Sequence, residues 1–198
     1  MILYFDTETT GLKPGKICQL SYLMQSDKGT LAKNFFFSVP FVEYSAYMVH
    51  GFSVDKLNIL SGGKVFSESI EEIQNDFYSA NLIIAHNVDF DLSFLNREFS
   101  LVGKTFIYKK SFCSMKETTE ICQIPRKNGC GYKYPKLMEL CAHFGVSDVE
   151  IQQDTARLFG DSSSYHDARF DTTALYLAVN KGMEDKLLFL RNFLGELE

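Results

Sequence analysis

The chain opens on the stretch Ile2-Leu3-Tyr4-Phe5-Asp6-Thr7-Glu8-Thr9-Thr10-Gly11. Its apolar and aromatic start predicts one buried strand. Alternate side chains of a strand share a face, so Asp6 and Glu8 point the same way. Two carboxylates at the end of a buried strand repel each other and are costly to desolvate unless a cation neutralises them. A divalent metal ion with oxygen ligands would do this, whereas an ordinary acidic turn is the simpler interpretation of the segment alone.

Length and composition indicate an ordinary globular protein. The 198 residues fit one α/β domain over residues 1–198, and 45% hydrophobic with 23% charged residues excludes a disordered chain. No apolar run approaches the ~20 residues of a membrane span. The chain starts with an expected strand and lacks the basic start and apolar core of a signal peptide. We therefore expect a cytoplasmic protein with no membrane association.

The cysteines are odd in number and form no Cys-x-x-Cys pair, which indicates reduced thiols. A zinc site is a weaker alternative, because structural zinc sites have tighter spacings. It would draw on Cys113, Cys122, Cys130, Cys141 and His143.

Basic residues are concentrated in one part of an acidic chain. The formal net charge is −5, yet residues 104–136 carry eight Lys and Arg residues against Glu117 and Glu120. Such a segment can follow a phosphate backbone, and a solvated lysine-rich surface is the alternative interpretation. Within it, residues 129–135 form an expected loop in which aromatic and basic residues alternate.

Hydrophobic periodicity and turn residues predict the secondary structure. Strands are expected over residues 2–5, 17–25, 31–39 and 82–85. Helices are expected over residues 44–50, 54–60, 67–78, 114–124, 136–144, 167–179 and 184–194, and a further helix is expected from Asp89 to about Phe99. Ser67 and Asp89 are the expected N-caps of their helices. The first three strands should be antiparallel, with a hairpin at Asp27-Lys28-Gly29.

Four carboxylates then stand at the ends of different elements, with a histidine five residues before the last of them. The set comprises Asp6, Glu8, Asp91, Asp171 and His166. The segments that hold them resemble, in order, the three motifs of the DnaQ-like (DEDD) 3′→5′ exonucleases. These segments are Phe5-Asp6-Thr7-Glu8-Thr9-Thr10-Gly11, Ala85-His86-Asn87-Val88-Asp89-Phe90-Asp91 and His166-Asp167-Ala168-Arg169-Phe170-Asp171. The histidine five residues before the last aspartate is typical of the DEDDh branch of this family.

The resemblance implies a ribonuclease H-like α/β fold. A mixed five-stranded sheet, with three antiparallel strands plus parallel additions, would have helices on both faces. It also implies a site for two divalent cations, Mg²⁺ or Mn²⁺, because hard oxygen ligands suit these ions. Asp6 would bridge the ions, Glu8 and Asp171 would bind the ion beside the attacking water, and Asp91 would act partly through water. His166 would be the general base. With no Cys or His among the ligands, catalytic zinc is disfavoured.

The resemblance further implies how substrate binds. The terminal nucleotide would contact Thr9, Gly11, Leu12, His86, Asn87 and Phe90, and Leu12 would wedge between the last bases. Lys133 and Lys136 would hold the incoming strand. The expected activity is release of nucleoside 5′-monophosphates from single-stranded DNA 3′ ends, of the proofreading or repair type. A DNA polymerase or another replication or repair protein is the expected partner, and homodimers are known in parts of the family.

Two alternatives remain open from the sequence. One is a 3′→5′ exoribonuclease of the oligoribonuclease or RNase T-like kind. The runs Cys113-Ser114-Met115-Lys116 and Tyr132-Lys133-Tyr134-Pro135-Lys136-Leu137 resemble segments of polymerase III ε-like and TREX-like DNA exonucleases, which favours DNA. The other is a non-catalytic nucleic-acid-binding accessory module, which the intact set of carboxylates disfavours. The chain ends near its last expected helix, so a stand-alone nuclease is expected rather than a replicase subunit.

Overall fold

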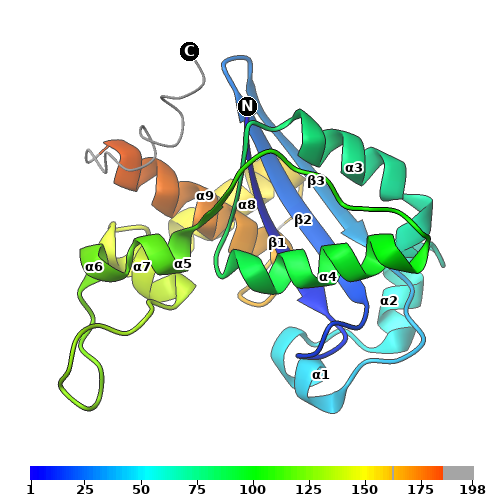
Figure 1. Ribbon diagram of the computed structural model, residues 1–198, viewed down its shortest axis with the longest axis horizontal. Helices are drawn as coiled ribbons and strands as arrows, with labels where there is room; N and C mark the ends of the chain where they lie inside the picture. Colours follow the sequence, from blue (N-terminus) through cyan, green and yellow to red (C-terminus); the bar gives the residue numbers. More distant parts are fainter. Residues whose placement is uncertain (162, 185–198) are drawn as a thin grey trace.

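The computed structural model describes residues 1–161 and 163–184 and shows a five-stranded sheet in the order β3-β2-β1-β4-β5 (Figure 1). The strands are β1 (Ile2–Thr9), β2 (Ile17–Ser26), β3 (Gly29–Phe36), β4 (Leu82–Ala85) and β5 (Ser111–Cys113). β1 and β3 are both antiparallel to β2, whereas β4 is parallel to β1 and β5 is parallel to β4. The expected mixed sheet is confirmed.

Helices cover both faces of this sheet, as expected (Figure 1). They are α1 (Tyr44–His50), α2 (Val54–Ser61), the 3₁₀ turn η1 (Phe66–Glu68), α3 (Ile70–Ser79), α4 (Val88–Leu101), α5 (Ser114–Glu117), α6 (Thr119–Cys122), α7 (Leu137–His143), α8 (Asp148–Phe159) and α9 (Ala168–Glu184). α3 and α4 lie on one face, and α8 and α9 lie on the other. The helix expected over residues 184–194 lies outside the described residues, apart from Glu184, the last residue of α9.

The alternation of β1 decides which face each of its side chains joins. Leu3 and Phe5 pack in the core cluster with α3 and α4, whereas Tyr4 packs in the cluster with α7 and α9. The same alternation assigns Thr7 to the α4 face, and Asp6 and Glu8 to the α9 face. The end of β1 therefore supplies polar side chains toward the N-termini of both helices.

Two expected helices differ in the structure. The single helix expected over residues 114–124 is divided into α5 and α6 at Thr118, whose hydroxyl donates to the Ser114 carbonyl oxygen at 2.7 Å. Such back-bonding competes with regular helical hydrogen bonds and bends helices. α3 begins at Ile70 rather than near Ser67, because Ser67 belongs to the preceding 3₁₀ turn.

Two other features of the helices were not expected. The N-cap of α4 is Asn87 rather than Asp89, and its φ of 76° is a left-handed conformation that Asn tolerates better than most residues. α8 was not predicted, because its buried face is narrow and includes only Ile151 and Thr155. Its one clear signal is the Ser147 side chain, which caps the helix by accepting from the Glu150 N–H.

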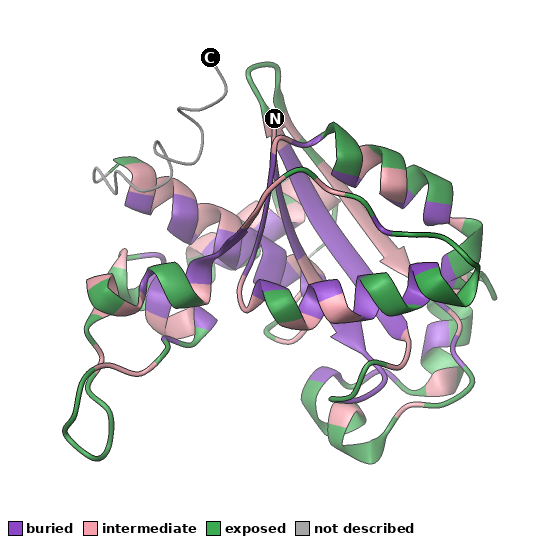
Figure 2. Cartoon of the chain, viewed as in Figure 1, coloured by how far each residue is buried: buried purple, intermediate pink, exposed green. Residues whose placement is uncertain are grey.

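The last part of the basic segment forms a projecting hairpin between α6 and α7, with Arg126, Lys127, Lys133 and Lys136, whereas its four other lysines precede α6. Pro125 and Tyr132 make an isolated antiparallel bridge, and the residues between them are exposed (Figure 2). Prolines and glycines leave this hairpin without a packed face, so it extends away from the sheet (Figure 1). It is therefore available to a long, charged ligand.

The expectations about thiols and membrane spans can be compared with the structure directly. All five cysteines are free. Over residues 1–161 and 163–184, no cysteine cluster suited to zinc occurs. Within the same ranges, none of the helices has both the length and the apolar character that a membrane crossing requires.

Candidate functional site

The predicted carboxylates come from three elements that meet near the C-terminal end of β1. Asp6 and Glu8 lie on β1, Asp91 lies in the first turn of α4, and Asp171 lies in the first turn of α9. Burial is the largest cause that raises the pKa of Asp6, and the charges of Asp91, Asp171 and Glu8 raise it further. The four groups are therefore close enough to influence one another's ionisation.

Asp91 is held in place by the strand between the two β1 carboxylates. Its Oδ1 accepts from the Thr7 backbone N–H at 3.1 Å and from the Thr7 hydroxyl at 2.7 Å. The residue is only 2% exposed. These two bonds fix one carboxylate oxygen of Asp91 to β1 and orient the whole group.

Asp171 has a buried oxygen without a protein partner. Among the described residues, its Oδ1 is one of two buried side-chain oxygen or nitrogen atoms that make no hydrogen bond. Leaving such an acceptor unpaired costs roughly 1–3 kcal/mol, and more when the group is charged. A cation bound beside Asp171 would satisfy this oxygen, so the residues present fit a metal ion.

Burial and mutual repulsion weaken the acidity of the whole group. Burial is the largest cause that raises the pKa of Asp6 and of Glu8, and neighbouring carboxylates raise both pKa values further. Burial also raises the pKa of Asp91 to about 7 and that of Asp171 to about 7. The protein alone cannot hold all of these groups ionised at neutral pH, and bound cations would restore their charged forms.

His166 lies inside the carboxylate cluster. One ligand atom each from Glu8, His166 and Asp171 lie within 4.8 Å of one another. From the sequence, we expected no histidine among the metal ligands, whereas in the structure a ring nitrogen of His166 lies within this distance of both carboxylates. The pKa of His166 is lowered by partial burial, so its imidazole is neutral near pH 7.

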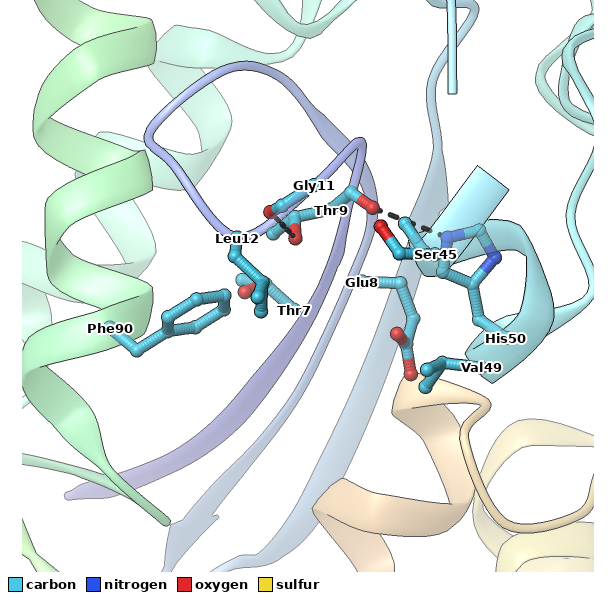
Figure 3. A pocket seen from close by; sticks show the side chains of 10 residues that line it. Thr7, Glu8, Thr9, Gly11, Leu12, Ser45, Val49, His50 and Phe90 are labelled. Atoms are coloured by element: carbon cyan, nitrogen blue, oxygen red, sulfur yellow. Dashed lines mark hydrogen bonds between the residues drawn. The ribbon is translucent and has the colours of Figure 1, made fainter. Parts of the chain in front are cut away.

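A cavity of about 300 Å³ opens beside Glu8 (Figure 3). It is lined by Thr7, Glu8, Thr9, Gly11, Leu12, Ser45, Ala46, Val49, His50 and Phe90. Leu12 and Phe90 stand on one side, whereas Glu8 points toward the orange segment at the start of α9. Four residues predicted to bind nucleotide, namely Thr9, Gly11, Leu12 and Phe90, are thus brought together.

The contribution of α1 to this cavity was missed. Ser45, Ala46, Val49 and His50 all come from this helix. His50 joins the helix to the strand, because its Nε2 lies 3.2 Å from the Thr9 carbonyl oxygen and its Nδ1 accepts from the Phe52 N–H. A buried histidine at the end of a short helix, just before Gly51, was the available signal.

The glycine of the first motif lies close to the start of α1. A Cβ atom on Gly11 would lie 2.4 Å from the carboxylate carbon of Glu43, which is the end of an exposed side chain that can move away. The Glu43 N–H also donates to the Thr10 carbonyl oxygen at 2.9 Å. The loop that carries Leu12 is therefore pressed against the start of α1.

The remaining predicted substrate residues do not line the cavity. His86 uses both ring nitrogens internally, with Nδ1 3.0 Å from the Ser114 hydroxyl and Nε2 3.0 Å from the Pro135 carbonyl oxygen. Burial lowers its pKa to about 4. Asn87 serves as the N-cap of α4. In this structure His86 joins the base of the basic hairpin to the second motif.

The two predicted strand-binding lysines lie where the hairpin returns to α7. Lys133 forms an ion pair with Glu139, whereas Lys136 is exposed directly before α7. Pro135, which contacts His86, lies between them in the chain. The two lysines therefore flank the point where the hairpin is bonded to the second motif.

Comparison with known proteins gives relatives by sequence. No protein-family model matches the chain. DNA polymerase III subunit epsilon of Rickettsia conorii is 30% identical over 74% of this chain and 63% of its own length. The subunit of the same name from Buchnera aphidicola is 27% identical over 98% of this chain and 80% of its own length. That of Escherichia coli is 27% identical over 74% of this chain and 61% of that protein. The chain therefore spans less than two thirds of several of these relatives.

Solved structures show the same fold at lower identity. The metal-free form of an Escherichia coli ExoI–ssDNA complex superposes with a TM-score of 0.66 at 15% identity, over 98% of this chain and 42% of that one. The zinc-bound form of that complex gives a TM-score of 0.62 at 16% identity, over 95% and 41% of the two chains. These similarities concern the fold of the whole described chain.

Proposed function

The chain belongs to the DnaQ-like 3′→5′ exonuclease family and has its ribonuclease H-like fold; on that premise, we propose that it is a metal-dependent exonuclease. It would remove nucleoside 5′-monophosphates one at a time from the 3′ end of single-stranded DNA. The observation that carries the proposal is the unpaired buried oxygen of Asp171, within a carboxylate cluster that adjoins the cavity.

The metal ions would be held by Asp6, Glu8, Asp91 and Asp171. Two bound divalent cations would stabilise the negative charge on the attacking water and on the leaving 3′ oxygen. Oxygen ligands favour Mg²⁺ or Mn²⁺. The nearness of His166 to Glu8 and Asp171 makes Zn²⁺ an ion to test as well.

His166 would accept the proton of the attacking water on a ring nitrogen. A general base must be unprotonated before it acts, and the lowered pKa of His166 keeps its imidazole neutral near pH 7. Thr7 would keep Asp91 oriented through its two hydrogen bonds. Positioning of this kind lowers the barrier because the reacting groups need not be reorganised.

The cavity would receive the terminal nucleoside. Its apolar side chains, Leu12, Val49 and Phe90, suit the flat face of any base, and such contacts are tolerant of sequence. Leu12 is 80% exposed, which fits a side chain that inserts between the last two bases. Lys133 and Lys136 would act further from the terminal nucleotide, on the strand that leads to it. His86 and Asn87 would support the hairpin and the start of α4 instead.

Single-stranded DNA is the favoured substrate because ExoI, the structural neighbour, is described in complex with ssDNA. The relatives are named as subunits of DNA polymerase III, so a role in proofreading or repair beside a polymerase belongs to the proposal. A cytoplasmic location fits such a role. Homodimerisation stays a prediction.

The first experiment compares 3′-labelled and 5′-labelled single-stranded DNA with matching RNA. Each substrate is incubated with Mg²⁺, Mn²⁺, Zn²⁺ or EDTA. Wild-type protein is compared with Asp6→Asn and His166→Ala. Stepwise release of 5′-monophosphates from the 3′ end of DNA, lost in EDTA and in both variants, is the expected result.

The same experiment separates the alternatives. Faster release from RNA would make the protein an exoribonuclease with the same site. Binding of single-stranded DNA without release of nucleotides under any metal would leave a non-catalytic accessory module. Release that persists in Asp6→Asn at the wild-type rate would refute the proposed metal site.

A further inference from the structure

A buried polar network lies beside the carboxylate cluster and uses none of its four members. At its centre is Gln19 of β2, which is 0% exposed. The Gln19 Nε2 donates to Asn34 Oδ1 and to Asp167 Oδ1, both at 2.9 Å, and its Oε1 accepts from the Ala168 N–H at 3.1 Å. The sheet is thereby bonded to the residues that directly follow His166.

Arg169 closes this network from the other side. Its Nε donates to Asp167 Oδ1 at 2.9 Å and its Nη2 donates to Asp167 Oδ2 at 2.7 Å, so the guanidinium grips both carboxylate oxygens. Its Nη1 lies 3.6 Å from an oxygen of Asp161, and the guanidinium lies over the Phe36 ring. The Arg169 side chain is only 16% exposed. Exposed ion pairs add little, whereas a bidentate, mostly buried pair restricts geometry.

The segment held in this way carries the catalytic histidine of the proposed function. His166 has a φ of 65°, a left-handed conformation that residues other than glycine seldom adopt. Such a conformation is unfavourable and persists only when the surrounding structure holds it. Asp167 helps to hold the backbone of His166 in this conformation. Its N–H donates to the Ser164 carbonyl oxygen, and its Oδ1 accepts from the Arg169 N–H at the start of α9.

We propose that Arg169 is a positioning residue for His166. Its guanidinium grips Asp167 and so fixes the residue that directly follows the imidazole presented to Glu8 and Asp171, and it also lies near Asp161. A lysine cannot replace it fully, because an ammonium group lacks the planar fork that binds two carboxylate oxygens at once. This inference rests on the proposed function, since it assigns a role to His166.

The test compares wild-type protein with Arg169→Ala and Arg169→Lys. Arg157→Ala is the matched control, because the Arg157 Nε donates to Asp154 at 2.9 Å in an exposed pair on α8. We expect kcat on single-stranded DNA to fall roughly 10- to 100-fold in Arg169→Ala, since a small displacement of a catalytic group has effects of this size. KM should stay within about twofold, because the nucleotide cavity is untouched. Arg169→Lys should lose part of kcat, and added guanidinium ion should restore part of it in Arg169→Ala.

A second readout does not depend on activity. Mn²⁺ bound by the carboxylates should broaden the NMR signals of the His166 ring in wild-type protein. In Arg169→Ala the broadening should weaken, while calorimetry shows that Mn²⁺ still binds. Circular dichroism and thermal unfolding monitor the fold, and Arg169→Lys carries the test if Arg169→Ala does not fold.

The outcomes are distinct. The positioning role would be overturned if Arg169→Ala had the kcat of wild-type protein and if Mn²⁺ broadened its His166 NMR signals as strongly as in wild-type protein. So would equal losses of kcat in Arg169→Ala and Arg157→Ala. If wild-type protein degrades no nucleic acid, the proposed function fails, and the broadening of the His166 signals still decides whether Arg169 positions this side chain.

Discussion

The carboxylates gathered at the end of β1 make the metal-free protein less stable. Four carboxylates share a buried region, and burial is the first cause that raises the pKa of each. One oxygen of Asp171 has no hydrogen-bond partner in the described part of the chain. Natural proteins retain such unfavourable groups where function needs them, so the cluster indicates a bound cation more strongly than any one motif does.

This arrangement predicts how the stability of the metal-free protein depends on pH. Asp91 and Asp171 have folded-state pKa values of about 7 against ordinary values of 3.8, so the folded protein keeps protons that the unfolded chain has lost. Stability should therefore fall as pH rises through 7. Between pH 6.5 and 8 in EDTA, we expect the free energy of unfolding to fall by about 1–2 kcal/mol, measured by urea denaturation.

The controls isolate the carboxylates. Burial lowers the pKa of His50, His86 and His166, and these groups act with the opposite sign until the unfolded histidines have lost their protons, about one pH unit above 6.5. The contribution of one carboxylate is therefore taken from the difference between wild-type protein and Asp171→Asn. Asp171→Asn should be more stable than wild-type protein at pH 8 in EDTA and should show a smaller pH dependence. Saturating Mn²⁺ should remove most of the wild-type loss. An unchanged pH dependence in Asp171→Asn would mean that Asp171 does not titrate in this range.

At the level of elements, α4 serves the site along its whole length. Its first turn supplies Phe90 and Asp91, and two turns later Glu98 holds the loop that follows β1. The Glu98 Oε1 accepts from the Ile17 N–H at 3.0 Å and its Oε2 accepts from the Lys16 ammonium at 3.1 Å. One helix thus positions a predicted metal ligand, a wall of the cavity and the loop that bears Leu12.

Glu98→Ala tests this second anchor. The substitution leaves the Ile17 N–H unpaired and removes the partner of Lys16, so we expect a loss of about 2 kcal/mol in the free energy of unfolding. KM for single-stranded DNA should rise more than kcat falls, because the loop lines the nucleotide cavity. Glu71→Ala is the control, since the Lys104–Glu71 pair is exposed and should change stability by less than about 0.5 kcal/mol. Equal effects of the two substitutions would contradict the anchoring role.

At the scale of the whole molecule, charge is separated between the sheet end and the hairpin. The acidic cluster lies where β1 meets the first turns of α4 and α9, while the hairpin that carries Arg126, Lys127, Lys133 and Lys136 projects beyond α6 (Figure 1). His86, at the end of β4, bonds Ser114 at the start of α5 and Pro135 at the base of the hairpin. In the proposed function, a strand whose phosphates lie along the hairpin would deliver its end to the cluster, so a net charge of −5 does not oppose the proposal.

Salt dependence measures this contribution. We expect Lys136→Ala to weaken single-stranded DNA binding and to reduce the slope of log K against log salt by about 0.7, the value for one phosphate contact on a single strand. Lys133→Ala should have a smaller effect, because Lys133 is paired with Glu139. Lys28→Ala, in the turn between β2 and β3, is the control at the opposite end of the sheet. Fluorescence anisotropy at several salt concentrations gives the slopes, and a wild-type slope in Lys136→Ala would exclude this lysine from the contact.

Much of this arrangement is predictable from local pattern. Strand β4 and helix α1 have the expected bounds, because a short apolar run and a helix that ends before Gly51 are strong local signals. The mixed sheet follows from the hairpin at Asp27-Lys28-Gly29 and from the family resemblance. α8 and the break at Thr118 were not predicted, because tertiary packing and a side-chain hydrogen bond overrode weak periodicity there.

The sequence alone determined the alternating strand β1, the types of residue at its end and the order of the three motifs, because these depend on local spacing. Only the tertiary structure decided which groups share space. It added α1 to the cavity, turned His86 inward and built the network from Gln19 to Arg169. Each of these contacts joins residues far apart in the chain. Their distances are set by how the helices pack on the sheet, which local pattern does not encode.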